Sequence, residues 1–428
     1  MLELTNIGLR GLALGSKFVL LFFLARFLPP AQIGLYGLVT ASISYGVMTL
    51  GLDFYTYATR QMLSNDRNLW ATYIRDQTAA YGVVYFFELP LFLFLFGFGV
   101  LPWELAGWFF ALLVCEHIAR ELNRLLVVVG RPVLATVTFL FQSGFWVWFV
   151  LTIMFFHSDV RKLWIVFAAW IVGDIVAIAF GIFVGMRGIR WRDRTPRVNW
   201  SWIRKGIRVA AIFLVATLSL RGVFAADRII VKQAAGLDLL GVYTFYIGMA
   251  MSATSFLDAG VFTFLYPRVV AAFRTGKLPQ FRALMHRLWL QTAGVTAILL
   301  VIIALAFKPV LGLLNHPVYL DHLPVMWILL GVVALYALGM VPHYGLYAFG
   351  RDRTIMASHL TGFITFLGAS IGLARIWPLG GVAVGLAVGM STILGIKLAC
   401  YLHAYGQLVG PHAVSTTAVK SGPIVYME

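Results

Sequence analysis

Residues 288–307 read LWLQTAGVTAILLVIIALAF, a run with no charged side chain. A helix needs about 20 mostly apolar residues to cross the hydrocarbon of a bilayer, so this run has the length of one crossing. Its second half is continuously apolar, whereas a strand of a membrane β-barrel alternates apolar and polar residues. The run therefore predicts a transmembrane α-helix and argues against a barrel.

The composition of the whole chain agrees with this interpretation. Of 428 residues, 61% are hydrophobic and only 12% are charged, whereas soluble domains are about half apolar and about a quarter charged. This excludes a water-soluble fold. The two cysteines, Cys115 and Cys400, lie in apolar stretches, which supports neither a disulfide scaffold nor a zinc site. We expect no cofactor and no bound metal.

Runs of similar length, separated by charged residues or by Pro and Gly, recur along the chain and predict twelve crossings. They are 11–28, 33–52, 78–99, 105–128, 133–156, 163–186, 207–231, 241–265, 288–307, 323–346, 355–376 and 379–403. The first run is interpreted as a retained helix. The stretches 56–77 and 268–287 mix cations with apolar residues, as helices lying on the membrane surface do.

The positions of lysine and arginine predict the orientation, because short cytoplasmic loops are enriched in these residues. With a cytoplasmic N-terminus, most of the 33 cations fall on the inner side, including Arg120, Arg124 and the basic stretch 187–208, RGIRWRDRTPRVNWSWIRKGIR. That stretch is either a hinge between two halves or a loop that only sets topology. Both termini are then cytoplasmic. We therefore interpret the net charge of +16 as topology and expect no nucleic-acid partner.

An internal repeat divides the chain into two halves. Gly34 and Tyr36 align with Gly241 and Tyr243, the triplet QTA occurs at 77–79 and again at 291–293, and Gly130-Arg131 aligns with Gly350-Arg351. The three matches occur in the same order in both halves of the chain. Six crossings per copy give both copies the same orientation, so we predict two parallel six-helix lobes around a central cleft that opens to either side. The expected parts are a lobe at 1–186, a basic cytoplasmic linker at 187–206, a lobe at 207–404 and a polar tail at 405–428.

Ionisable residues inside the predicted crossings are the first candidates for function, because a charge at mid-bilayer is costly unless it faces a partner or a water-filled cavity. They are Glu88, Asp174, Arg221, Asp227, Arg228, Asp258, Lys17 and Lys397. Each has a structural alternative: Lys17 and Lys397 could extend to the headgroups, Glu88 could stabilise a kink at Pro90, and Arg221 could pair with a carboxylate elsewhere in the bundle.

The sequence contains no GxxxxGK[ST] phosphate-binding loop, so direct ATP hydrolysis by this chain has no support. Transport would then be secondary or driven by a partner. The predicted outer loops are short, which argues against an enzyme acting on sugars outside the membrane, and we expect no enzymatic activity.

Several motifs resemble those of polysaccharide-biosynthesis flippases, the O-antigen and exopolysaccharide exporters of the multidrug/oligosaccharidyl-lipid/polysaccharide (MOP) superfamily. In the first half they are Ala25-Arg26-Phe27-Leu28, Gly34, Tyr36, Gly51-Leu52-Asp53 and Arg60; in the second half they are Asp227-Arg228, Gly241-Val242-Tyr243 and Pro267. The chain departs from the family at 28–31, where two prolines replace the usual Gly-Pro followed by an acidic residue.

The resemblance implies a carrier of undecaprenyl-pyrophosphate-linked oligosaccharide in a bacterial inner membrane, working for polysaccharide biosynthesis beside polymerase or export proteins and in contact with membrane lipids. On this hypothesis the cations of the cleft that bind pyrophosphate are Lys17, Arg26, Arg221 and Lys397, and the candidates for ion or proton coupling are Glu88, Asp174, Asp227 and Asp258. The alternatives are a cation-coupled multidrug antiporter of the same superfamily and a membrane glycosyltransferase or ligase. The sequence leaves open the sugar, the coupling ion, the resting conformation, the oligomeric state and which intramembrane charges line the cleft.

Overall fold

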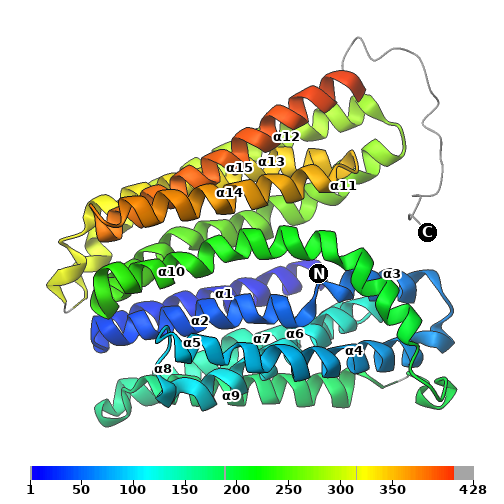
Figure 1. The fold of residues 1–428 in the computed structure, drawn as a ribbon, viewed down its shortest axis with the longest axis horizontal. Coiled ribbons are helices and arrows are strands. Elements are labelled where there is room, and N and C mark those ends of the chain that lie inside the picture. The colour runs from blue at the N-terminus through cyan, green and yellow to red at the C-terminus, as the bar shows by residue number, and fades with distance from the viewer. Residues whose placement is uncertain (1, 188, 315, 409–428) are drawn as a thin grey trace.

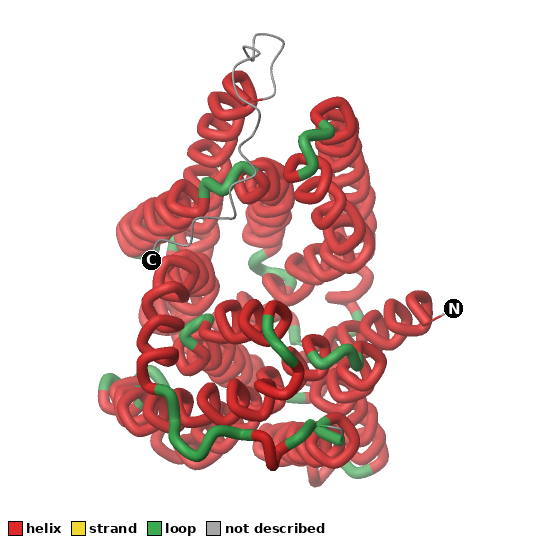
Figure 2. Tube along the Cα trace, turned by 90° about the vertical axis from the view of Figure 1, so that its right-hand side faces the viewer, coloured by secondary structure: helices red, strands yellow, loops and turns green. Residues whose placement is uncertain are grey.

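The computed structural model describes residues 2–187, 189–314 and 316–408, and in these ranges the chain is helical with short connections (Figures 1 and 2). The predicted tail, from residue 409 on, lies outside the described residues. The N-terminal half contains α1 (Leu2–Phe27), α2 (Pro30–Gly51), α3 (Phe54–Ser64), α4 (Trp70–Leu91), α5 (Leu93–Gly97), α6 (Ala106–Val128), α7 (Pro132–Leu140), α8 (Trp146–Phe156) and α9 (Leu163–Phe180). The C-terminal half contains α10 (Trp200–Leu257), α11 (Thr263–Arg274), α12 (Leu278–Gly312), α13 (Leu323–Ala348), α14 (Asp352–Leu373) and α15 (Pro378–Leu408).

The described helices account for each of the twelve predicted crossings. The long helix α10 supplies two of them, because Gly236 adopts a positive φ of 80° and divides the helix into a first limb and a second limb. The second limb continues through a π-helical turn, Asp258–Phe262, into α11. Likewise, α7 and α8 form one crossing through the π-helical turn Phe141–Phe145.

Length and composition alone identify fewer crossings. Nine segments of the described chain are long and apolar enough to span a membrane, and Trp200–Arg274 counts there as one segment. Helix α6 is not among the nine, since it contains Glu116, Arg120, Glu121 and Arg124 within 23 residues. These four charges are the first sign that α6 faces the interior of the protein instead of lipid.

The predicted surface helices are only partly present. Residues 54–64 form the separate helix α3, with a strongly amphipathic sequence. By contrast, α11 and α12 extend almost to meet each other across the turn at Thr275 to Lys277, so the predicted surface helix at 268–287 is absent from the described chain. Apart from Lys277 in the turn, the cations there lie on continuations of the two membrane helices.

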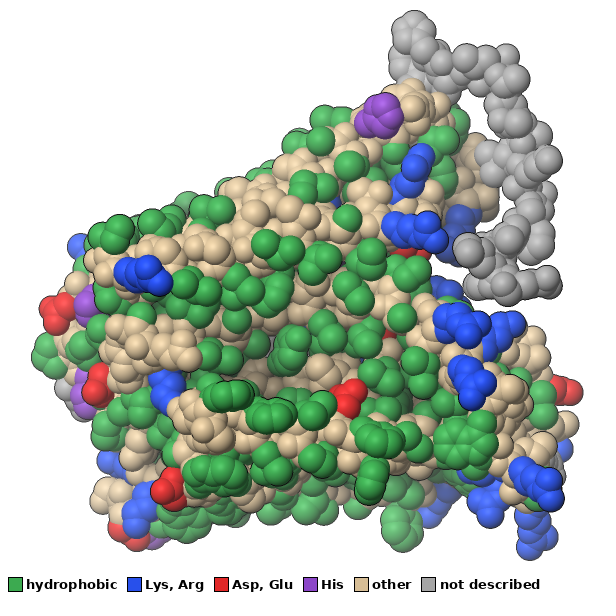
Figure 3. All heavy atoms as spheres, viewed as in Figure 1, with side chains coloured by type: hydrophobic (Ala, Val, Ile, Leu, Met, Phe, Trp, Pro, Cys, Tyr) green, Lys and Arg blue, Asp and Glu red, His purple; other side chains and the backbone are tan. Residues whose placement is uncertain are grey.

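Lysine and arginine side chains gather at one end of the molecule, on the right in Figure 3, and the face between the two ends is mostly hydrophobic. We call this the basic end; it contains the connection between the halves and the turns at Gly130 and Gly350. In Figure 1, α12 and α15 slant away from the N-terminal half toward this end. We call the other end, with the α1–α2 turn and the Gly236 kink, the opposite end.

The two halves are in closest contact near the opposite end, where α2 packs against the second limb of α10. A Cβ added at Gly241 would lie 2.0 Å from the backbone oxygen of Pro30, and one added at Gly34 would lie 2.3 Å from a backbone oxygen of α10. Gly37 lies against the side chain of Thr244. Gly34 aligns with Gly241 in the repeat, and Gly37 then aligns with Thr244, so equivalent positions of the two copies meet, as they do beside a two-fold axis.

The Gly-Arg motif of the repeat also has equivalent geometry in both halves. Gly130 and Gly350 have positive φ angles of 80° and 69°. In each case the next residue donates its backbone N–H to the last turn of the preceding helix, Arg131 to Leu126 and Arg351 to Leu346. This is a glycine C-cap, which explains why a Gly-Arg pair ends α6 and α13 alike.

Candidate functional site

The main candidate site is a cavity of about 650 Å³ between the two halves. Its N-terminal wall comes from α1, α2, α6, α9 and the start of α8, and its C-terminal wall comes from the second limb of α10 and from α12. The charged side chains on it are Lys17, Glu116 and Arg120, all from the N-terminal half. The wall from α10 and α12 contributes apolar and small polar residues, including Met249 and Ile303. We call this space the interlobe cavity.

The carboxylate of Glu116 has a fixed position. Gln142 donates a hydrogen bond of 2.7 Å from Nε2 to Glu116 Oε2, and Trp170 donates one of 2.8 Å from Nε1 to Oε1. Gln142 lies in the π-helical turn between α7 and α8, a distortion that is frequent at functional sites. Both carboxylate oxygens of Glu116 therefore have a neutral donor.

The two cations of the interlobe cavity lack such partners. Lys17 Nζ lies 5.7 Å from the centroid of the Trp170 ring, over its face. Arg120 is one helical turn beyond Glu116 on α6 and lies on the same cavity wall. The three ion pairs within 4.0 Å in the described ranges involve neither Lys17 nor Arg120. Their charges are therefore available to a ligand in the cavity.

Asp174 lies behind this wall, in α9. Its side chain is 0% exposed, and neither carboxylate oxygen has a hydrogen-bond partner. Glu116, Lys17 and Arg120 are close enough to act electrostatically on it. The four residues thus form one group of charges inside the N-terminal half, with Asp174 as the buried member without a hydrogen bond.

Two of these residues were missed by the sequence analysis. Glu116 was not among the predicted intramembrane charges, and Arg120 was counted with the cations of the inner side; in the structure both lie in α6 on the wall of the interlobe cavity. The signal was present: Glu116 and Arg120 are spaced i,i+4, and Glu116 is near the middle of the predicted crossing 105–128. Applying the rule for charged residues to that crossing would have found Glu116.

The C-terminal half contributes Arg221, on the first limb of α10. Its side chain is exposed. It is close enough to Arg120, Asp53 and Asp258 to influence them electrostatically, so it faces the N-terminal half. Asp258 begins the π-helical turn before α11 and is also exposed. Arg221 and Arg120 are thus cations of opposite halves that lie near each other.

A second space between the halves, of about 580 Å³, lies on the side of the first limb of α10. Residues of α2, α4, α5, α10 and α14 line it, and most are apolar; Glu88 is the charged residue among them. Figure 3 shows a hydrophobic face with an acidic side chain near its centre. We call this space the lateral groove. Pro90 lies within α4, two residues after Glu88, so the structural alternative for Glu88 is compatible with its place here.

Asp227 has a different environment from the other predicted coupling residues. Its side chain is 0% exposed and accepts hydrogen bonds from the Arg228 guanidinium, at 3.0 Å and 3.2 Å, and from Tyr243 Oη at 2.9 Å. All three residues belong to the motifs that resemble those of the flippases. The contacts connect the two limbs of α10, which is a structural role.

Three of the predicted cleft cations, Arg26, Arg221 and Lys397, line none of the three cavities described here. Arg26 is in the last turn of α1, at the opposite end, with its guanidinium 5.6 Å from the Phe27 ring centroid. Lys397 is 2% exposed and lies within the C-terminal half, close enough to His343 and His359 to affect them electrostatically. Their role in binding substrate stays a prediction.

The remaining motif residues have packing or backbone roles in the structure. Asp53 and the residue before it, Leu52, both adopt left-handed φ angles, 48° and 49°, at the sharp junction of α2 and α3. Burial raises the pKa of Asp53. Tyr36 lines the interlobe cavity, Arg60 packs its guanidinium 5.8 Å from the Phe213 ring, and Pro267 lies inside α11.

The structure superposes on an inward-facing multidrug resistance MATE family transporter of the MOP superfamily with a TM-score of 0.72 and 16% identity, covering 95% of this chain and 98% of that one. An outward-facing MATE family transporter of the same superfamily gives 0.56 at 17% identity, covering 95% and 94%. A MOP superfamily transporter from Pyrococcus furiosus, described as having a binding pocket of reverse polarity, gives 0.60 at 16% identity and covers 95% of each chain.

No family model matches the sequence, and no curated protein does. The similarity to solved structures therefore concerns the fold. Its high coverage extends over both halves, in agreement with the predicted pair of six-helix lobes. The chain is an all-helical multi-pass membrane protein with the two-lobe fold of the MOP superfamily transporters.

Proposed function

We propose that this protein is a flippase that moves an undecaprenyl-pyrophosphate-linked oligosaccharide across a bacterial inner membrane by alternating access. The observation that carries the proposal is the interlobe cavity, where Lys17 and Arg120 lie without ion-pair partners beside a largely apolar wall. Arg221 lies near Arg120 on the facing half. A pyrophosphate fits this arrangement, since guanidinium groups bind phosphate oxygens through paired, charge-assisted hydrogen bonds.

The lateral groove supports the same substrate class. A polyprenyl chain is too long for the interlobe cavity, so a flippase needs an apolar path by which the chain remains in lipid while the headgroup crosses. The groove is lined by side chains such as Leu91, Phe94 and Ile229 and lies between the same two halves. It is therefore the natural place for the lipid tail.

The contacts between the halves support an inward-open state. The tight glycine packing of α2 on α10 closes the opposite end, whereas the helices of the C-terminal half slant away at the basic end (Figure 1). The better superposition on the inward-facing structure, 0.72 against 0.56, agrees with this. With the basic end in the cytoplasm, as the distribution of cations favours, the cavity receives its substrate from the inner leaflet.

A cation-coupled multidrug antiporter is the second candidate. The buried carboxylate of Asp174, which has no hydrogen-bond partner, favours it, because such a group is suited to bind a proton or a cation. Two of the structural neighbours are MATE multidrug transporters. The two candidates differ in which charge holds the substrate: cations for the flippase and carboxylates for the antiporter. Catalysis is not proposed.

Reconstitution in liposomes separates the candidates. A fluorescent polyprenyl-pyrophosphate oligosaccharide placed in one leaflet should become accessible to a lectin on the other side at a rate that Arg120→Gln and Lys17→Gln each reduce at least tenfold. Lys162→Gln, an exposed cation at the opposite end, is the matched control and should leave the rate unchanged. Uptake of a cationic dye driven by an ion gradient, with no lipid translocation, would instead establish the antiporter.

A further inference from the structure

A third cavity, of about 410 Å³, lies at the basic end and belongs entirely to the N-terminal half. The turn before α4, the end of α6, the start of α7 and the chain after α9 surround it. Four arginines line it, Arg67, Arg131, Arg187 and Arg190, and no acidic residue is on its wall. We call it the arginine pocket. It is separate from the interlobe cavity and shares no lining residue with it.

Part of the pocket is a fixed frame. Arg131 donates a hydrogen bond of 2.7 Å to the backbone oxygen of Val184 and another to that of Arg187, so it holds the chain that leaves α9. Arg190 donates one of 3.3 Å to Asn68 Oδ1, which closes the pocket from the side of α4. These contacts use neutral oxygens and leave the positive charges uncompensated.

The other two arginines are available for binding. Arg67 lies with its guanidinium 5.5 Å from the Trp70 ring centroid, which orients the side chain without neutralising it. Arg187 is exposed. None of the ion pairs in the described chain includes any of the four arginines. Four guanidinium groups around one space repel each other, and a bound anion removes that repulsion.

We propose that the arginine pocket binds the phosphate group of an anionic phospholipid headgroup. Guanidinium groups match phosphate geometry, and basic pockets between membrane helices at the cytoplasmic surface suit acidic lipid headgroups. Trp70 on the wall is a residue type that prefers the depth of the headgroups. Free phosphate has the same chemistry and is distinguished in the experiment. The inference goes beyond the proposed function, since the pocket lies outside the space between the halves.

The test uses the purified, delipidated full-length protein in detergent. Short-chain phosphatidylglycerol should raise the midpoint of thermal unfolding in a saturable manner, and short-chain phosphatidylcholine should not. Arg67→Gln combined with Arg187→Gln should weaken the apparent affinity for phosphatidylglycerol at least tenfold. The matched control is Arg192→Gln with Arg194→Gln, which removes the same charge from exposed positions off the pocket wall and should have no effect.

A second variant and a second ligand complete the test. Asn68→Asp retains all four arginines but adds a carboxylate to the wall, so it should also weaken binding even if the double variant folds poorly. Inorganic phosphate at millimolar concentration tests the other source. If inorganic phosphate stabilises the protein as much as phosphatidylglycerol does, the pocket is a free-phosphate site and the lipid assignment is wrong. If all variants bind phosphatidylglycerol with equal affinity, or if both lipids stabilise the protein equally, the arginine pocket is not the binding site.

Discussion

Tyr243 Oη donates a hydrogen bond of 2.9 Å to Asp227 Oδ2, and this contact joins the two limbs of α10 across the kink at Gly236. Asp227 also pairs with Arg228, so its carboxylate is satisfied although it is completely buried. The Asp-Arg pair and the Gly-x-Tyr motif are separate in the sequence. In the structure they form one network that fixes the angle between the seventh and eighth crossings.

Tyr243→Phe should destabilise the protein, because it removes one hydrogen bond to a buried charge and leaves the packing of the ring in place. Such bonds contribute about 1.5–3 kcal/mol. We expect the free energy of unfolding, measured by titration with SDS in mixed micelles, to fall by that amount. Tyr45→Phe is the control, since no hydrogen bond of Tyr45 is present in the described structure; an equal loss in both variants would contradict the assigned role.

Gly241→Ala should affect both stability and conformation. The added Cβ would lie 2.0 Å from the backbone oxygen of Pro30, and backbone cannot move aside as a side chain can. Overpacking of this kind costs about 1–3 kcal/mol. Because the contact closes the opposite end, the variant should open that end, which faster labelling of a cysteine introduced at Thr40 by a membrane-impermeant reagent added on the side of the opposite end can detect.

Gly372→Ala is the matched control for that experiment. Gly372 also lies inside a helix, but nothing is within 4 Å of its ideal Cβ position. It should be neutral or slightly stabilising, since alanine favours helix more than glycine does. If labelling at Thr40 rises equally in both variants, the close packing of α2 on α10 does not control the opening.

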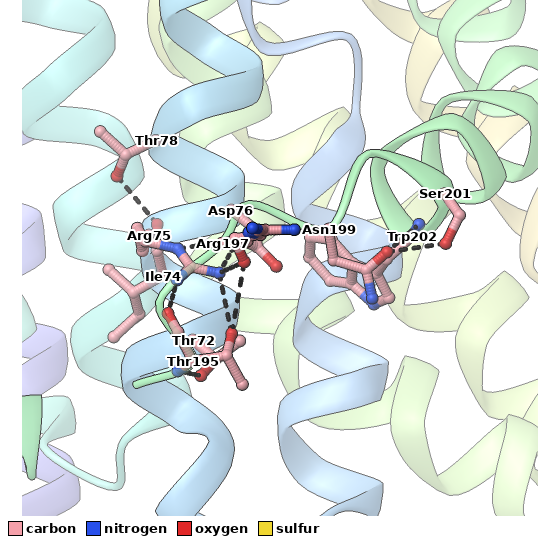
Figure 4. A network of polar contacts seen from close by, with 10 residues as sticks. All are labelled: Thr72, Ile74, Arg75, Asp76, Thr78, Thr195, Arg197, Asn199, Ser201 and Trp202. Carbon is pink, nitrogen blue, oxygen red and sulfur yellow. Dashed lines mark hydrogen bonds and ion pairs between the residues drawn. The ribbon is translucent and has the colours of Figure 1, made fainter. Parts of the chain in front are cut away.

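The linker between the halves is held by Arg75, as Figure 4 shows. The Arg75 guanidinium donates hydrogen bonds to the backbone oxygens of Thr195 and Arg197 and forms an ion pair with Asp76. In addition, the backbone N–H of Thr195 donates a hydrogen bond of 3.1 Å to Thr72 Oγ1. Residues 195–197 of the linker are therefore bound to α4 in the N-terminal half.

Arg75→Gln should release the linker without unfolding either half. Chymotrypsin should then cleave after Trp191 at least several-fold faster than in the unmodified protein, as followed by mass spectrometry of the fragments. Arg197→Gln removes a charge from the same region but keeps the backbone oxygen that Arg75 binds, so its cleavage rate should not change. Equal rates in all three proteins would mean that the hydrogen bonds to Arg75 do not restrain the linker.

Much of the fold could be predicted from the sequence, because the charged residues, Pro and Gly between apolar runs mark where one crossing ends and the next begins. The repeat also predicted which positions would be equivalent, and Gly34 and Gly241 indeed meet in the structure. The glycine C-caps at Gly130 and Gly350 follow from the same alignment.

The candidate site was less predictable. An intramembrane charge is visible in a sequence, but whether it faces a cavity, a partner or its own lobe depends on helix rotation and on distant neighbours. Asp174 and Asp227 both lie within predicted crossings, yet only Asp227 accepts hydrogen bonds from an arginine and a tyrosine. Glu116 lies inside the predicted crossing 105–128, but Gln142 and Trp170, which fix its carboxylate, come from other segments and do not follow from spacing within that crossing.

Asp174→Asn provides the sharpest test of the charge group in the N-terminal half, because Asp227→Asn is a control of the same chemistry. Both side chains are 0% exposed, but Asp174 has no hydrogen-bond partner and Asp227 is paired. Burying a carboxylate without a partner is costly, so Asp174→Asn should raise the midpoint of thermal unfolding. Breaking a buried ion pair costs about 3–5 kcal/mol, so Asp227→Asn should lower it.

The same two variants distinguish a functional carboxylate from a structural one. If Asp174 is retained for coupling, Asp174→Asn should lose ion-driven transport in liposomes while the protein becomes more stable, a combination that a packing role does not produce. Asp227→Asn should lose stability and activity together. Full ion-driven transport by the Asp174→Asn variant would show that another residue couples ion movement to transport. A lowered unfolding midpoint of the same variant would mean that the Asp174 carboxylate stabilises the fold through its neighbours Lys17 and Arg120.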